Sequence, residues 1–235
     1  MWWARSEPPV QAWLGAGRVA RSLPDGDVVV TTIGSAQEGL GVLASSHKDQ
    51  PGKKPVRLWL ASDLCTLTCM PAIAGVKRLE EAQAAAAAWL QSQARVPAGW
   101  TPRLAECDRA SAFWRVAACP DGLLEQIQRQ LPVQSVRPWW SWALQQLDGR
   151  DRGLCAYDGA ALVFCDWNAV GQLPSAETIG PVADIEAARR LLKRRSMQRP
   201  AGHVFAQLDW TAGDGPAAAD AAFAFAPWVR WSDAL

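Results

Sequence analysis

The chain has 235 residues, of which 49% are hydrophobic and 20% are charged, so it can form one large domain or two small lobes and is not a disordered, charge-driven polypeptide. Its 24 Lys+Arg and 23 Asp+Glu residues give a formal net charge of +1, which excludes a global attraction to nucleic acid or to an anionic membrane. The N-terminal residues lack the features of a signal peptide, and no stretch reaches the ~18 apolar residues of a membrane span. We therefore expect a cytoplasmic protein.

Apolar and β-branched runs separated by turns predict strands in the first part of the chain, at residues 10–14, 18–23, 27–33, 56–60 and 64–70. A short helix is predicted at residues 34–46, and a polar loop with two prolines follows at residues 46–55. Apolar side chains at the helical period predict a longer helix at residues 75–94.

The middle of the chain alternates strands with helices. Strands are predicted at residues 112–119 and 133–136, with a helix at residues 121–131 between them. Pro120 is expected in the first turn of this helix, where its missing N–H group costs nothing. A further helix is predicted from Pro138 to about residue 147.

A charged stretch flanked by glycines, residues 148–153, predicts a boundary within the chain. It divides the protein into a first lobe, residues 1–148, and a shortened second lobe, residues 149–235. Beyond it, Asp158-Gly159 between two apolar runs predicts a β-hairpin. A helix at 184–197 and a strand at 203–210 follow, whereas the alanine-rich residues 213–226 are ambiguous. This mixture of strands and interleaved helices predicts an α/β fold.

The residues that most often bind metals are sparse or poorly spaced. Zinc sites use pairs of Cys or His two to four residues apart, but the sequence has only two histidines, and Cys65 and Cys69 lie in a strand pattern without a second pair. We expect no metal site and no cofactor. The cysteines are interpreted as small buried thiols, most clearly Cys65, Cys69, Cys119 and Cys165.

Other patterns that could carry catalysis are also weak. Ser46, His47 and Asp49 are close in sequence, but catalytic triads assemble from separate elements, so we interpret them as part of a solvated loop. The Gly15-Ala16-Gly17 turn joins two strands rather than a strand and a helix, which is not the arrangement of a phosphate-binding loop. Asp158 and Asp166 are interpreted as a turn residue and an exposed strand end. No catalytic residue is predicted.

Tryptophan is unusually common, with 14 residues against 5 Phe and 1 Tyr. In the helix that follows Pro138, successive side chains point ~100° apart, so Trp139, Trp140 and Trp142 cannot all be buried on one face. The helix at residues 184–197 has an apolar side and many basic residues, which fits an ordinary surface helix or a site for an anionic partner. The candidate partner-binding residues are therefore Trp139, Trp140, Trp142, Arg189 and Arg190.

Several blocks together resemble a known family. The sequence VRLWLASDL at residues 56–64, the strand that ends at Pro71 and the helix at residues 75–94 are similar to the strand–strand–Pro–helix block of actin-like bacterial assembly proteins. This family includes the type IV pilus assembly protein M and the cytoplasmic part of the type II secretion platform protein L. The blocks from Trp114 to residue 147 and the hairpin at residues 153–166 fit the same pattern.

The resemblance implies a pair of actin-like, ribonuclease-H-like lobes. Each lobe would have a mixed sheet with flanking helices, and the second lobe would be reduced. It also implies a scaffolding role on the cytoplasmic face of a pilus or secretion machine. Nucleotide-binding relatives carry an Asp-x-Gly-rich turn followed by Ser or Thr in each half. Here the turn at residues 14–17 lacks an aspartate, and Asp158-Gly159-Ala160-Ala161 lacks hydroxyl groups, which argues against binding of ATP with Mg²⁺.

The expected function is that of a non-catalytic adaptor in a type IV pilus or type II secretion-like assembly. It would bind a segment of an inner-membrane protein partner through a groove or a sheet edge, and would be peripheral to the inner membrane through that partner. Two alternatives stay open: a nucleotide-binding, actin-like ATPase, and a tryptophan-rich module that binds a peptide or a carbohydrate. No nucleic-acid partner is expected, and the sequence does not indicate an oligomeric state.

Overall fold

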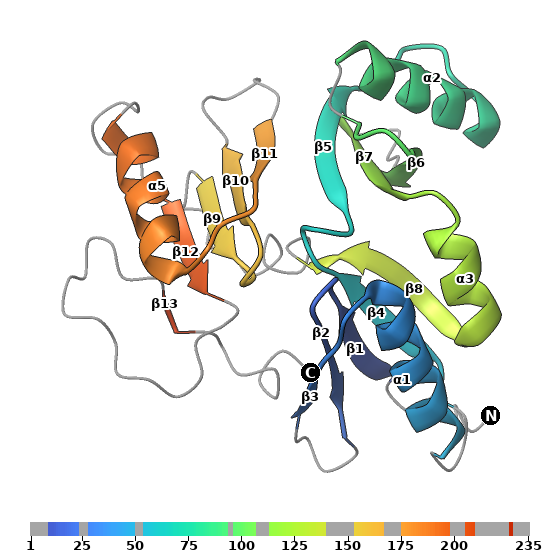
Figure 1. Ribbon diagram of the computed structural model, residues 1–235. Helices are drawn as coiled ribbons and strands as arrows, with labels where there is room; N and C mark the ends of the chain where they lie inside the picture. Colours follow the sequence, from blue (N-terminus) through green and yellow to red (C-terminus); the bar gives the residue numbers. More distant parts are fainter. Residues whose placement is uncertain are drawn as a thin grey trace, which may run out of the picture.

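The computed structural model describes residues 9–23, 28–49, 54–93, 96–106, 113–139, 153–166, 175–197, 205–209 and 226–227. These residues form a mixed α/β structure, as the sequence predicts, and its strands are arranged in three sheets (Figure 1). None of the helices within the described ranges combines the length and the apolar character needed to cross a membrane.

The first sheet has five strands in the order β3-β2-β1-β4-β8. Strand β2 is antiparallel to β1 and β3, whereas β1, β4 and β8 run parallel. Helices α1 and α3 cover one face and bury Leu14, Leu40, Leu58 and Ile127 against it (Figure 1). The elements are β1 (Val10–Leu14), β2 (Arg18–Ser22), β3 (Val28–Thr32), α1 (Ala36–Lys48), β4 (Val56–Leu60), α3 (Leu123–Gln130) and β8 (Val133–Pro138).

The second sheet is antiparallel, with the order β5-β7-β6, and helix α2 packs on it. Met70, Ala86, Trp114 and Val116 belong to its core. Gln83 of α2 donates to the carbonyl of Pro102 at 3.0 Å and accepts from the amide of Leu104 at 2.7 Å. The elements are β5 (Thr66–Pro71), α2 (Leu79–Ser92), β6 (Trp100–Glu106) and β7 (Phe113–Pro120).

The third sheet lies in the later part of the chain, with the order β11-β10-β9-β12-β13. Its first three strands are antiparallel neighbours, and β12 is parallel to β9. Helix α5 packs on this sheet through Ala188 and Leu192, which meet Cys155 and Phe164 in one core (Figure 1). The elements are β9 (Gly153–Tyr157), β10 (Leu162–Asp166), β11 (Ser175–Ile179), α5 (Ile185–Met197), β12 (Phe205–Asp209) and β13 (Ala226–Pro227).

Most predicted elements are confirmed, with four differences. Strands β6 and β11 are not predicted by the sequence patterns, and Pro120 ends strand β7 instead of starting α3. Helix α1 continues to Lys48, so His47 lies in a helix rather than in the expected loop. Helix α2 starts at Leu79, later than predicted, because Glu81 accepts from the backbone amides that precede the first turn. Residues 140–152, which include the predicted boundary, lie outside the described residues.

Two glycines in α1 allow a matched test of packing. A Cβ atom at Gly39 would lie 2.6 Å from both Ile33 Cδ1 and Leu14 Cδ1, whereas a Cβ at Gly41 would meet nothing within 4 Å. We expect Gly41→Ala to stabilise the protein by up to ~1 kcal/mol because alanine is the better helix former. Gly39→Ala should be less stable than Gly41→Ala by at least ~1 kcal/mol because the core is overpacked. Urea unfolding of both variants checks this, and equal stability would contradict the packing of α1.

Candidate functional site

One buried aspartate joins the first and third sheets. Asp158 lies in the turn between β9 and β10 and is only 1% exposed. Its Oδ1 atom accepts hydrogen bonds from the backbone amides of Ala160 at 3.1 Å and Ala161 at 2.9 Å. Gly159 in the same turn has a φ of 87°, a conformation that favours glycine. One oxygen of the carboxylate thus holds the hairpin turn in place.

The other oxygen of Asp158 reaches the first half of the chain. Its Oδ2 atom accepts from the backbone amide of Ser62 at 2.7 Å and from the indole Nε1 of Trp139 at 2.9 Å. The indole also lies 3.0 Å from Ser62 Oγ, and all three residues are buried. A buried charge needs donors on its lone pairs, and here both carboxylate oxygens have them.

A second carboxylate lies beside the first. Asp63 Oδ2 accepts from the backbone amide of Ala16, in the turn between β1 and β2, at 3.0 Å. Its Oδ1 atom is buried and has no hydrogen-bond partner among the described residues. We call Ala16, Ser62, Asp63, Trp139 and Asp158 the carboxylate junction. It brings together the β1–β2 turn, the segment after β4, the residue after β8 and the β9–β10 turn.

The environment of Asp63 disfavours its charged form. Burial is the largest cause and raises the pKa of Asp63 above its ordinary value of 3.8. The amide of Ala16 opposes this shift, the neighbouring Asp158 carboxylate adds to it, and Arg18 weakly opposes it. Two carboxylates therefore share a partly buried region in which only Asp158 has donors on both oxygens.

The glycine turn of the first sheet packs tightly. A Cβ atom at Gly15 would lie 2.8 Å from the ring of Trp13, and the Gly15 amide donates to the Arg18 carbonyl. The amides of Ala16, Ala160 and Ala161, at the two glycine turns, all bind carboxylate oxygens of this chain. A bound anion would have to displace an aspartate to use these amides.

The interpretation of Asp158 as a turn residue is confirmed but incomplete. It makes the expected turn contacts, but it is also buried and bonded to Ser62, which lies 96 positions earlier. The role suggested for Trp139 as a partner-binding residue does not fit its burial, because a ring that is 1% exposed has little surface to offer. Trp140 and Trp142 lie outside the described residues. Nothing in the local sequence indicates that Trp139 and Asp158 meet.

The basic candidates lie on α5, apart from these contacts. Arg189 forms an ion pair with Glu186 at 2.5 Å, one turn earlier on the same helix, and Arg190 is exposed. Arg195 lies over the ring of Phe164, 5.7 Å from its centre. Two of the basic side chains of α5 therefore make contacts within α5 and with the third sheet.

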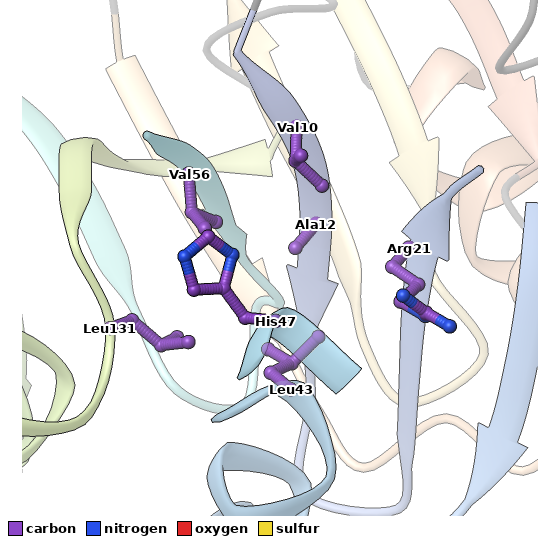
Figure 2. A pocket seen from close by; sticks show the side chains of 7 residues that line it. All are labelled: Val10, Ala12, Arg21, Leu43, His47, Val56 and Leu131. Carbon is purple, nitrogen blue, oxygen red and sulfur yellow. The ribbon is translucent and has the colours of Figure 1, made fainter. Parts of the chain in front are cut away.

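His47 lines a small apolar cavity rather than a catalytic site. Figure 2 shows its ring close to Val56, with Leu43 and Leu131 nearby. Neither buried ring nitrogen has a hydrogen-bond partner in the part of the chain that the structure describes. The cavity volume is about 10 Å³, at the lower limit for one water molecule. Its described lining contains no serine and no carboxylate. The structure therefore brings no catalytic set together around His47.

The cysteines with described surroundings are free thiols, as expected. Cys65 and Cys119 lie in the core under the first sheet, and burial raises both pKa values, that of Cys119 to about 11. Within the described ranges, no three His, Cys, Asp or Glu side chains gather in a way that could hold a metal ion.

An open groove lies between β5 and α2, over residues 72–79. Its volume is about 500 Å³, and Trp114 contributes to its wall. Ile73 and Leu79 in its lining are 42% and 67% exposed, and Lys77 and Arg78 lie between them in sequence. Exposed apolar side chains with neighbouring charges are typical of a surface that binds another protein.

Comparisons with known proteins identify a fold. No protein-family model matches the chain, and no curated protein matches it. Its structure is similar to the cytoplasmic domain of EpsL, an inner membrane component of the type II secretion system of Vibrio cholerae. The TM-score is 0.52 and the sequence identity is 12%, and the match covers 85% of this chain and 81% of the EpsL chain. A structure of the PilM–PilN type IV pilus biogenesis complex gives a TM-score of 0.47 and 14% identity, over 83% of this chain and 67% of the other. The EpsL comparison confirms, at the level of the fold, the resemblance found in the sequence.

Removal of the central carboxylate should be costly. Asp158→Ala leaves the backbone N–H groups of Ser62, Ala160 and Ala161 without their acceptor and leaves the Trp139 indole with Ser62 Oγ alone. Each buried unsatisfied donor costs ~1–3 kcal/mol. We expect urea unfolding to show that the free energy of unfolding falls by at least ~3 kcal/mol. The control is Asp49→Ala, at an exposed position, which should change the free energy of unfolding by no more than ~0.5 kcal/mol. Equal effects of the two substitutions would contradict the role of Asp158.

The second aspartate should give a pH-dependent signature. Because the pKa of Asp63 is raised in the folded state, this carboxyl group loses its proton first in the unfolded chain, and its contribution to the stability of the wild-type protein falls as pH rises above 3.8. Asp63→Asn has no such titration and keeps an oxygen for the Ala16 amide. The stability of this variant relative to wild type should therefore increase from pH 4 to pH 7. The test is to measure the free energy of unfolding of both proteins across this pH range. If the value for Asp63→Asn minus that for the wild type fell as pH rose, this would contradict the raised pKa of Asp63.

Proposed function

We propose that this chain is a non-catalytic scaffold subunit of a type IV pilus or type II secretion-like assembly, where it binds a segment of a protein partner at the cytoplasmic face of the inner membrane. The observation that carries the proposal is the fold shared with the EpsL cytoplasmic domain, because that protein is named as an inner membrane component of a secretion system. The sequence blocks that resemble the same group of assembly proteins support it.

The proposal includes an actin-like arrangement of two lobes, residues 1–148 and 149–235. The carboxylate junction is consistent with it, since Asp158 of the later part bonds to Ser62 and Trp139 of the earlier part. In such an arrangement, the turns that would surround a nucleotide are the β1–β2 and β9–β10 turns, and these are the turns at the junction.

The chemistry of the junction supports a non-catalytic role. A phosphate group binds at such turns through free backbone N–H donors. The amides that could bind phosphate already bind Asp63 and Asp158. This disfavours the alternative of an actin-like ATPase.

The groove over residues 72–79 is the surface we assign to the partner. Ile73 and Leu79 offer apolar contact, and Lys77 and Arg78 add positive charge beside them. A partner segment with apolar and acidic residues would match both features. Arg190, Trp140 and Trp142 stay predicted contributors to partner binding.

Nucleotide binding is the direct test of the non-catalytic part. A nucleotide present at a hundredfold excess over its dissociation constant would stabilise the protein by ~2.7 kcal/mol. We expect no change in the melting temperature with ATP and Mg²⁺ beyond that with Mg²⁺ alone. A saturable shift with ATP would contradict the non-catalytic role and favour the ATPase alternative.

Co-purification tests the assembly role. The tagged chain should capture inner-membrane pilus or secretion subunits encoded beside it, and Ile73→Lys with Leu79→Lys should weaken this capture at least ~10-fold, equivalent to ~1.4 kcal/mol. The matched control is Met197→Lys, an exposed apolar residue on α5. Capture of no such subunit, together with saccharide binding, would contradict the proposal and favour a carbohydrate-binding module.

A further inference from the structure

Sheet edges in this protein differ in how they are protected. Gln83 bonds to the backbone of β6, the edge strand of the second sheet. Strand β8 has a register shift against β4 and ends in Pro138, and β13 is two residues long and ends in Pro227. Strands β5 and β11, from different sheets, lie next to each other (Figure 1). Bulges, prolines, short strands and covering groups are the usual ways to protect an edge.

Among the residues that the structure describes, none gives strand β3 such protection. It is the other edge of the first sheet and reads Val-Val-Val-Thr-Thr, without a charge or a proline, and its register with β2 is continuous. Val29 is 40% exposed and Val30 is 60% exposed. An uncharged edge of β-branched residues is a good template for another strand.

The ladder between β2 and β3 identifies the backbone groups of β3 that β2 does not pair with. The amide of Ile33 donates to the carbonyl of Gly17, which makes this a hydrogen-bonded pair. Hydrogen-bonded and non-hydrogen-bonded pairs alternate along an antiparallel ladder, so the N–H and C=O groups of Val28, Val30 and Thr32 point away from β2. Three residues of β3 therefore present paired donors and acceptors to an incoming strand.

We propose that β3 pairs with β3 of a second copy of the chain, antiparallel and centred on Val30. A twofold axis there places Val30 opposite the second copy's Val30 and each Val28 opposite a Thr32, so the outward backbone groups of both strands are satisfied. The second copy fits because the strand is complementary to itself.

The side chains agree with this pairing. Val29 lies opposite Thr31 in the same register, so each cross-strand pair combines β-branched residues, and no charge meets a like charge. The pairing joins two five-stranded sheets into one continuous sheet. A five-residue strand pair buries less than the ~1,200 Å² of a standard stable interface, so the dimer should be reversible and concentration-dependent.

Disulfide trapping tests the register directly. In Val30→Cys the two introduced thiols lie opposite each other, with Cα atoms ~5.5 Å apart, a separation that a disulfide spans. With oxidised glutathione, which is reduced as the two thiols release their protons and form the bond, this variant should yield a covalent dimer. Thr32→Cys is the control, because its two copies would lie ~13 Å apart along the strands. Equal cross-linking of both variants, or none in Val30→Cys, would overturn the proposal.

Mass in solution gives a second, independent measurement. Sedimentation equilibrium of the full chain should show an average mass that rises toward twice the monomer mass with concentration. Val30→Lys places two like charges opposite each other and should keep the protein monomeric, with an unchanged circular dichroism spectrum. Met197→Lys replaces an apolar residue that is 80% exposed on α5 and should associate like wild type. The proposal would be overturned if the wild-type protein stayed monomeric at all concentrations. It would also be overturned if Val30→Lys and Met197→Lys reduced self-association equally.

Discussion

The burial of the Asp158 carboxylate is the constraint on which the relation between the two halves of this protein depends. A charge removed from water needs hydrogen bonds to both its oxygens, and the chain supplies them from Ser62, Trp139, Ala160 and Ala161. Separation of the third sheet from the first would break the contacts to Ser62 and Trp139 and leave buried groups without partners. The junction therefore favours one arrangement of the two sheets.

The same interaction bears on function. The glycine turns at the junction have backbone amides that could bind an anion, but aspartates of the chain itself already bind them. Asp63 is held there at a cost, because its second oxygen lacks a partner within the described residues and its charged form is disfavoured. A scaffold benefits from a rigid junction of this kind, whereas a nucleotide switch needs a site that its ligand can enter. The proposed surfaces, the groove over residues 72–79 and the edge strand β3, both lie outside the junction.

Sequence patterns predicted much of the fold because strands, turns and helices depend on neighbouring residues. The hairpin at Asp158-Gly159 and helix α5 follow from local composition and period, and both are present. Strand β6 escaped prediction because Pro102 interrupts its pattern, and it is held by pairing with β7 and by Gln83. His47 was expected in a loop because its neighbours are polar, but its ring packs against apolar residues of β4 and of the segment after α3.

The sequence by itself determined the α/β class, the order of most elements and the likeness to actin-like assembly proteins, because these depend on composition, period and block order along the chain. Only the tertiary structure decided that Asp158 is buried, that Trp139 points inward, and that no residue within the described ranges protects the edge strand β3. Each of these properties depends on residues far apart in the chain, such as Ser62 and Asp158, 96 positions apart. Burial and hydrogen-bond partners are set by what the fold places around a side chain, and the local sequence carries no record of those neighbours.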